Sequence, residues 1–139
     1  MPPHATKGFY MRITNGRVFN GQGFEDADVL VNGDRFVAEY DYVDDGIVID
    51  AAGCIVAPGL IDLHFHGAMG YETTTDDARA MDAIGAQKLR EGVTSCCPTT
   101  LTLPEEKLAA SLAHIESYRR QPSGAQVLGV HLEGPYVVS

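Results

Sequence analysis

The sequence predicts an α/β fold in two parts: a small β unit over residues 9–55, then a parallel sheet with helices over residues 56–139. Two observations support this. Before residue 56, short β-like segments alternate with turn-forming dipeptides. After residue 56, strand-like and helix-like segments alternate, and helical crossovers imply parallel strands. Residues 1–8 show neither pattern and are expected to form a disordered tail.

The N-terminal β unit is predicted mainly from two Asn-Gly dipeptides. Asn15-Gly16 and Asn32-Gly33 each lie between apolar residues, and this dipeptide favours the tight turn of a β-hairpin. We therefore expect an antiparallel unit. With only about 45 residues, such a unit is too small to bury much core by itself.

The pattern after residue 56 predicts the order β-α-β-α-β. Apolar residues recur at helical spacing in two segments, and shorter apolar runs lie before, between and after them. The expected strands cover 56–66, 93–100 and 125–133, and the expected helices cover 75–91 and 104–119. Three parallel strands in this order place their carboxyl ends at one edge of the sheet.

Both predicted helices carry residues that favour their ends. Thr75 can cap the first helix, and Gly92 suits the left-handed position that follows its last residue. Pro104 suits the first turn of the second helix. Arg119 and Arg120 favour the C-terminal end of that helix, because the helix dipole is negative there.

Charge and cysteine content exclude several classes of function. The formal net charge of -9 argues against nucleic acid or an anionic membrane as main partner, because both require a basic patch. A small anionic substrate is compatible with this negative charge. No apolar run is long enough to span a bilayer. Three cysteines, Cys54, Cys96 and Cys97, make an odd number, so we expect reduced thiols in a cytoplasmic protein.

Metal-ligand residues end two of the predicted strands. Asp62, His64 and His66 are spaced to share one face of the first strand, and His131 and Glu133 end the third strand. In α/β barrels this end of the strands is the active-site face. Two imidazoles and a carboxylate are a sound zinc constellation. Taken separately, structural histidines and a solvated glutamate are the simpler interpretation; together these residues favour a metal site.

Three stretches carry a family resemblance: APGLIDLHFHG, GVTSCCPTTLT and VLGVHLEGPYV. The first resembles the first barrel strand of the amidohydrolase superfamily. The other two resemble the N-acetylglucosamine-6-phosphate deacetylases within it, and His-Leu-Glu-Gly-Pro is the more specific motif. The resemblance covers nearly the whole chain. It implies the N-terminal part of a (β/α)8 TIM-type barrel, preceded by a small β-sandwich unit.

The resemblance also implies roles for the matched residues. Glu133 corresponds to the primary ligand of the catalytic metal, whereas His64 and His66 correspond to a second metal position that only some members have. His131 and Asp62 are expected to support the ligands or face the substrate without binding metal. The implied cofactor is a divalent metal. Zinc is the expected metal, bound as one or two ions.

The implied reaction is hydrolysis of the acetamide of N-acetylglucosamine 6-phosphate to glucosamine 6-phosphate and acetate. The expected partner is this small amino-sugar phosphate, with no nucleic acid and no membrane, in a cytoplasmic homo-oligomer. Other amidohydrolases, such as dihydroorotases, deaminases and D-aminoacylases, share the first-strand motif and stay as alternatives. They do not generally share His-Leu-Glu-Gly-Pro.

The barrel is expected to be incomplete in this chain. A whole (β/α)8 barrel takes about 250 residues, so residues 56–139 supply about three strands and two helices. The family's acid/base aspartate is expected beyond residue 139, and no catalytic residue is assigned within the chain. A fragment of a longer protein is the favoured explanation. Completion by another chain and a non-catalytic remnant that self-associates are the alternatives; the chain alone is predicted to be inactive.

Overall fold

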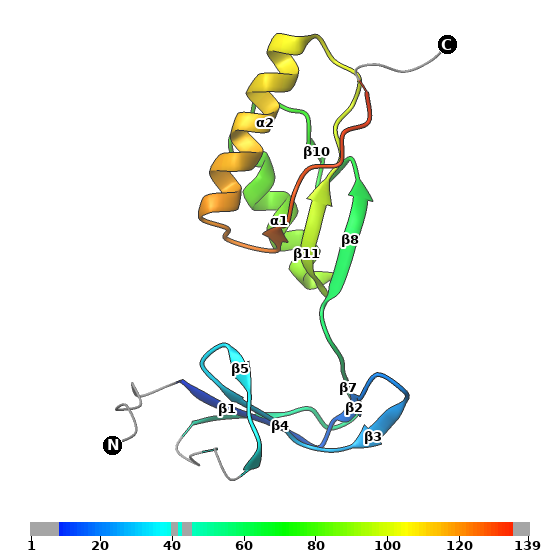
Figure 1. Cartoon of the computed structure of the whole chain (residues 1–139), viewed down its shortest axis with the longest axis vertical. Coiled ribbons are helices and arrows are strands. Elements are labelled where there is room, and N and C mark those ends of the chain that lie inside the picture. The colour runs from blue at the N-terminus through cyan, green and yellow to red at the C-terminus, as the bar shows by residue number, and fades with distance from the viewer. Residues whose placement is uncertain (1–8, 40–41, 43–45, 135–139) are drawn as a thin grey trace. The chain divides into compact units, whose positions relative to one another are not determined.

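The computed structural model describes residues 9–39, 42 and 46–134, so the tail expected at residues 1–8 lies outside the described residues. The chain divides into two compact units, Met1–Pro58 and Gly59–Ser139. Figure 1 shows the first unit as a group of short strands and the second as a sheet with two helices. All of the predicted site residues belong to the second unit.

The first unit is built from two small sheets. The strands described in it are β1 (Tyr10–Thr14), β2 (Arg17–Phe19), β3 (Phe24–Asp26), β4 (Val29–Asn32), β5 (Arg35–Phe36), β6 (Ile47–Asp50) and β7 (Ile55–Val56). One sheet has the order β5-β4-β1-β6 and the other the order β3-β2-β7. The hairpin predicted at Asn32-Gly33 is confirmed, because β4 and β5 pair antiparallel around Gly33, whose φ is 63°.

The hairpin predicted at Asn15-Gly16 is wrong. These residues turn the chain from β1 into β2, but the two strands belong to different sheets. β1 pairs with β4 on one edge and with β6 on the other, so it has no edge left for β2. The β1–β6 and β2–β7 pairs are parallel, so the unit is mixed and not antiparallel as expected. An Asn-Gly dipeptide sets a local turn, whereas distant segments decide which strands pair.

The second unit has the predicted β-α-β-α-β order. Its elements are β8 (Leu60–Phe65), β9 (Gly67–Ala68), β10 (Tyr71–Glu72), α1 (Ala80–Arg90), β11 (Val93–Pro98), α2 (Glu105–Arg120) and β12 (Gln126–Val127). The main sheet has the order β12-β11-β8 with parallel pairs, and both helices lie on one side of it (Figure 1). The described residues of the second unit thus form an α/β arrangement, and its strands do not close into a barrel.

The first strand of this unit starts later than predicted. Ile55 and Val56 form β7 and pair with β2, so β8 begins at Leu60 and not at residue 56. The apolar run that suggested one strand is therefore divided between two sheets. Pro58 lies between them, and it lacks the backbone N–H that a continuous strand would use for pairing.

The third strand is shorter than predicted, because β12 ends at Val127. The chain beyond it nevertheless continues alongside β11. The N–H of Leu128 donates to the Cys96 carbonyl, and the N–H of His131 donates to the Pro98 carbonyl, both at 3.0 Å. This spacing carries the third segment up to the carboxyl end of β11, where the predicted ligands lie.

Helix α1 begins later than predicted, and Thr75 does not cap it. The residues after β8 form the β9–β10 hairpin, which turns at Met69 and Gly70 with positive φ angles. The Oγ1 of Thr75 accepts the N–H of Asp77 at 3.3 Å and so stabilises a turn before the helix. The sequence signal marked a turn that the hydroxyl stabilises, not the first residue of the helix.

The other helix ends follow the prediction more closely. Gly92 follows α1 with φ 81°, and its N–H donates to the Leu89 carbonyl at 3.0 Å. Helix α2 begins directly after Pro104, which therefore precedes the helix and is not its first residue. Arg119 and Arg120 lie in its last turn, as the dipole argument predicts.

The core of the second unit lies between the sheet and the two helices. Residues from β8, β11, both helices and β12 pack together there: Phe65, Ala80, Met81, Ile84, Val93, Cys96, Ile115, Tyr118, Ala125 and Val127. Neither helix in the described part of the chain is long and apolar enough to span a membrane. The core holds the three parallel segments at fixed spacing beneath the predicted site.

The alternation expected along β8 is broken. If Asp62, His64 and His66 shared one face as expected, Ile61, Leu63 and Phe65 would share the other. Ile61 and Leu63 are instead 59% and 62% exposed, whereas Phe65 is 7% exposed. Asp62 points to the helix layer, since its carboxylate binds Lys88 of α1. The cause is an irregular pairing with β11, whose register shifts twice along β8. Such a shift moves side chains from one face to the other.

Candidate metal centre

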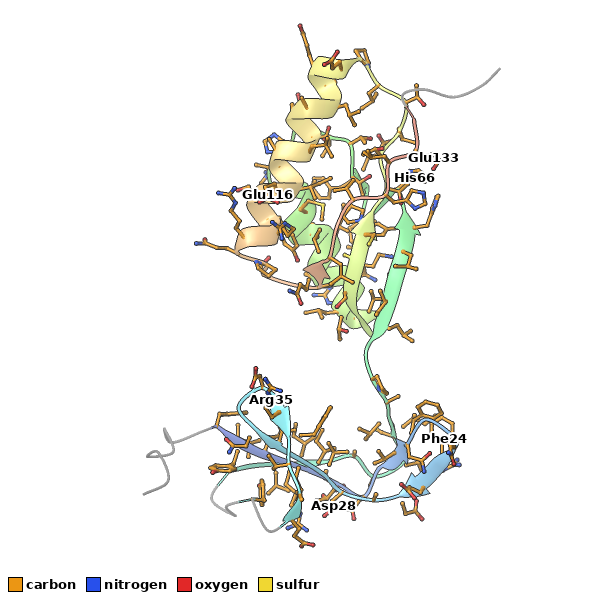
Figure 2. The ribbon with its side chains drawn as sticks, in the orientation of Figure 1. Phe24, Asp28, Arg35, His66, Glu116 and Glu133 are labelled. Atoms are coloured by element: carbon orange, nitrogen blue, oxygen red, sulfur yellow. The ribbon has the colours of Figure 1, made fainter. Side chains whose placement is uncertain are left out.

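Two strand ends bring the predicted ligands together. His64 lies in β8 and His66 directly follows it, while Glu133 lies two residues beyond His131, which bridges to Thr99 at the end of β11. Figure 2 shows His66 and Glu133 side by side at the carboxyl end of the sheet. Because parallel strands end at the same edge, residues about 70 positions apart become neighbours there.

The donor atoms of these residues form a compact triangle. His64 Nε2 and His66 Nε2 are 3.3 Å apart. Glu133 Oε2 lies 3.4 Å from the first of these nitrogens and 3.1 Å from the second. The three side chains are between 38% and 51% exposed, so a small ligand can reach them.

This triangle fits a divalent metal ion. In a tetrahedral zinc site with bonds of about 2.0–2.1 Å, neighbouring donor atoms are about 3.3 Å apart, which matches the three distances. Two imidazoles and one carboxylate leave the fourth position open, as in catalytic zinc sites. The Nε2 of His66 is the ring nitrogen directed at the site. Its Nδ1 is buried and has no hydrogen-bond partner among the described residues.

His131 lies beside the triangle without joining it. Its ring packs edge-on against His64, with ring centroids 4.8 Å apart. Its Nδ1 donates to the carbonyl oxygen of Leu63 at 3.2 Å, which leaves Nε2 without the proton in the neutral ring. The hydrogen bond fixes the orientation of this imidazole next to a predicted ligand. The predicted role of His131, to support the ligands or face the substrate, stays a prediction. The observed geometry is compatible with it.

Asp62 does not share the face of the two histidines, contrary to the alternation argument. Its Oδ2 accepts from Lys88 Nζ at 2.9 Å, and its Oδ1 accepts the backbone N–H of His64 at 3.1 Å. Burial raises the pKa of Asp62, but these two hydrogen bonds and the lysine charge outweigh burial and lower it overall. Asp62 therefore stays ionised and ties the His64 backbone to helix α1.

Lys88 is a supporting residue that the sequence analysis missed. Its Nζ also binds Glu91 at 3.3 Å and lies 4.6 Å from the centre of the Phe65 ring. Burial lowers the pKa of Lys88, but the bonds to both carboxylates outweigh it and raise the pKa overall. Lys88 gave no sequence signal, because its partner Asp62 lies 26 positions away in the chain.

Thr99 and Thr100 were also missed. Both are fully buried and both bind the backbone of the ligand-bearing segments. Their sequence signal is weak: two threonines directly after the last residue of a central strand, at the level of the ligands. The acid/base aspartate expected beyond residue 139 stays a prediction.

Comparison with known proteins places the chain in a family. The model of the Amidohydrolase family matches residues 55–139. The chain belongs to the amidohydrolase family. The N-acetylglucosamine-6-phosphate deacetylase of Bos taurus is 36% identical to it over 141 residues, which cover 96% of this chain and 34% of that relative. The N-acetylgalactosamine-6-phosphate deacetylase of Escherichia coli O157:H7 is 42% identical over 83 residues, which cover 59% of this chain and 22% of that relative.

A solved amidohydrolase structure resembles the chain as well. The crystal structure of N-acetylglucosamine-6-phosphate deacetylase from Pasteurella multocida matches with a TM-score of 0.80 at 26% identity, over 94% of this chain and 35% of that one. The resemblance to the deacetylases of this family is thereby confirmed. The chain spans about a third of the length of the relatives that it matches.

Proposed function

We propose that the full-length amidohydrolase carrying this segment removes the acetyl group from N-acetylglucosamine 6-phosphate, giving glucosamine 6-phosphate and acetate. The observation that carries the proposal is the triangle formed by His64, His66 and Glu133. It occurs in a chain similar to the Bos taurus deacetylase over nearly its whole length. Metal-ligand geometry and family membership thus support the same chemistry.

The fold supports a barrel in the full-length protein. We propose that β8, β11 and the segment that begins with β12 are the first three strands of a (β/α)8 barrel. Their parallel order and the helices on one side of the sheet fit this architecture. The relatives are about three times as long as the matched region, which leaves room for the other strands.

In the proposed site, Glu133, His64 and His66 hold a divalent metal, with zinc the ion that their donor set suits best. The triangle is the size for one ion that all three residues share, which is simpler than the two positions implied by the family resemblance. A bound divalent ion supplies Lewis-acid stabilisation of the charge that develops on the amide oxygen. His131 keeps Nε2 as the ring nitrogen available to a substrate group.

The proposal extends to the compartment of the protein. Cys54, Cys96 and Cys97 are all free thiols. Burial and the neighbouring Cys97 raise the pKa of the Cys96 thiol to about 11. Unpaired cysteines fit the reducing cytoplasm, where an amino-sugar phosphate would also be found.

Substitution of Glu133 tests the proposal in the full-length protein. Glu133→Ala is expected to lower deacetylase activity by at least about 10-fold, because it removes one donor of the metal site. Glu116→Ala is the matched control: this glutamate pairs with Arg119 and Arg120 on α2, away from the site (Figure 2), and should leave the activity unchanged. Release of acetate from N-acetylglucosamine 6-phosphate is the measurement. Unchanged activity of Glu133→Ala would refute the proposal.

N-acetylgalactosamine 6-phosphate is a second candidate substrate. The similarity to the Escherichia coli N-acetylgalactosamine-6-phosphate deacetylase favours it, at 42% identity over 83 residues. The two sugars differ only in the orientation of the C4 hydroxyl, and the proposed metal site would treat their acetamides alike. Measuring kcat/KM for both substrates separates the candidates, and the substrate with the higher value is the one assigned.

A further inference from the structure

A pair of adjacent threonines lies at the carboxyl end of the central strand β11. Thr99 and Thr100 directly follow Pro98, and both side chains have no exposed surface. A buried hydroxyl is costly unless it is hydrogen-bonded. Each of these hydroxyls is paired, and each is paired with a different neighbour of β11.

Thr99 holds the histidine-bearing strand. Its Oγ1 accepts the N–H of Phe65 at 3.1 Å, and its own N–H donates to the Phe65 carbonyl at 2.9 Å. Phe65 lies between His64 and His66, so both backbone polar groups of the residue that joins the two ligands are fixed by one threonine. Thr73 extends this contact, since its N–H donates to the His66 carbonyl and its hydroxyl donates to the Thr99 carbonyl.

Thr100 holds the glutamate-bearing segment in the same way. Its Oγ1 accepts the N–H of Glu133 at 3.1 Å, and its own N–H donates to the His131 carbonyl at 3.0 Å. Pairing of this segment with the central strand ends at the isolated bridge between Thr99 and His131, two residues before Glu133. The threonine hydroxyl therefore replaces a sheet hydrogen bond at the residue where the carboxylate must be placed.

We infer that Thr99 and Thr100 are positioning residues that set the distance between the two halves of the metal site. The inference rests on the proposed function, since it assumes that His64, His66 and Glu133 bind a metal. The two threonines are adjacent in the chain, and each hydroxyl accepts an N–H from a ligand-bearing segment 34 or 33 positions away. A shift of either segment by a few tenths of an ångström would disturb donor distances of 3.1 to 3.4 Å.

Binding of Co²⁺ to the full-length protein tests the inference without reliance on activity. Thr99→Val and Thr100→Val keep the side-chain shape but remove the hydroxyl oxygen. Each is expected to weaken Co²⁺ binding by about 10-fold, the lower end for residues that support metal ligands, and to change the visible absorption bands of the bound ion. Ser111→Ala is the control, because it removes a buried hydroxyl that donates to the Lys107 carbonyl within α2. Its affinity and spectrum should equal those of the unmodified protein.

Serine and alanine variants keep the test decisive if a valine variant does not fold. Thr100→Ser retains the hydroxyl and should bind Co²⁺ within about twofold of the unmodified protein, whereas Thr100→Ala should bind about 10-fold more weakly. Equal Co²⁺ affinities of Thr100→Ser and Thr100→Ala would overturn the inference. It would also be overturned if both valine variants bound Co²⁺ with the affinity and spectrum of the unmodified protein. Failure of the proposed function looks different: Glu133→Ala and His66→Ala would then bind Co²⁺ as well as the unmodified protein.

Discussion

At the scale of single residues, Asp62 and Lys88 beside the site hold each other in place as an ion pair. Asp62 and Lys88 are only partly exposed, and each satisfies the other through a 2.9 Å ion pair. The pair links β8 to α1 beneath His64, and the lysine also lies over the Phe65 ring. Removing one partner leaves the other charge without compensation, which costs more than the pair itself contributes.

Lys88→Met should therefore destabilise the full-length protein by about 1–3 kcal/mol, because it leaves the Asp62 carboxylate unpaired in a half-buried place. Urea unfolding at pH 7 measures the change. Arg120→Met is the matched control, since Arg120 is 74% exposed and binds Glu116 on the surface of α2. Its effect should stay within about 0.5 kcal/mol. Equal effects of the two substitutions would contradict the role given to Lys88.

Cys96 and Cys54 are expected to differ in reactivity. Cys96 is fully buried, and its raised pKa, about 11, means that its reactive thiolate is scarce until the pH approaches that value. Cys54 is exposed. Iodoacetamide at pH 8 should therefore modify Cys54 in the folded protein and Cys96 only after denaturation, as read from peptide masses. Equal labelling of the two in the folded protein would show that Cys96 is accessible.

At the scale of elements, the ends of helices and strands decide where the proposed ligands lie. Gly92 follows α1 in a left-handed conformation and turns the chain into β11, the strand that both positioning threonines directly follow. Gly67 directly follows His66 and packs so closely on the Tyr71 carbonyl that a side chain would collide with it. The backbone at Gly92 and the close contact at Gly67 thus require glycine at both positions. A sequence pattern can only suggest such a requirement.

Gly92→Ala should lower the free energy of unfolding by about 1–2 kcal/mol, the cost of a left-handed conformation for a residue with a side chain. Nothing lies within 4 Å of the position where its Cβ would be, so the effect isolates the backbone cost. Gly129→Ala is the control, because Gly129 also faces open space but has no positive φ. Urea unfolding should show no loss for Gly129→Ala; a loss equal to that of Gly92→Ala would refute the argument.

At the scale of the whole molecule, the second unit presents an uncovered apolar surface. Leu60, Ile61 and Leu63 of β8 are each about 60% exposed. Within the described residues β8 pairs only with β11, so its other edge has unpaired backbone groups. Exposed apolar patches and free strand edges both favour association with another chain. In the barrel proposed for the full-length protein, further strands would cover them.

A recombinant chain of these 139 residues is accordingly expected to be inactive and to self-associate at micromolar concentration. Light scattering coupled to size-exclusion chromatography measures its mass. Leu63→Lys should reduce the association, because it places a charge in the uncovered face. Leu89→Lys is the control on α1, where Leu89 is 46% exposed, and should not reduce it. A monomeric, metal-loaded and active chain would contradict the prediction.

Much of the second unit could be predicted from local patterns. The parallel β-α-β-α-β order, the glycine after α1 and the strand-end location of His64, His66 and Glu133 all follow from short-range spacing. The first unit was harder, because Asn15-Gly16 has the sequence of a hairpin turn but joins two sheets. Local sequence specifies a turn, whereas the pairing of strands is a competition between distant segments.

The sequence by itself determined which residues could bind a metal and at which end of the sheet they would lie. Only the tertiary structure decided how they are held there. The irregular pairing of β8 with β11 turned Asp62 toward Lys88, against the simple alternation of a strand. Thr99 and Thr100 acquired their partners from segments 34 and 33 positions away. Periodicity reports the preferences of a segment for its own conformation; hydrogen bonds between buried groups depend on which segments meet when the chain folds.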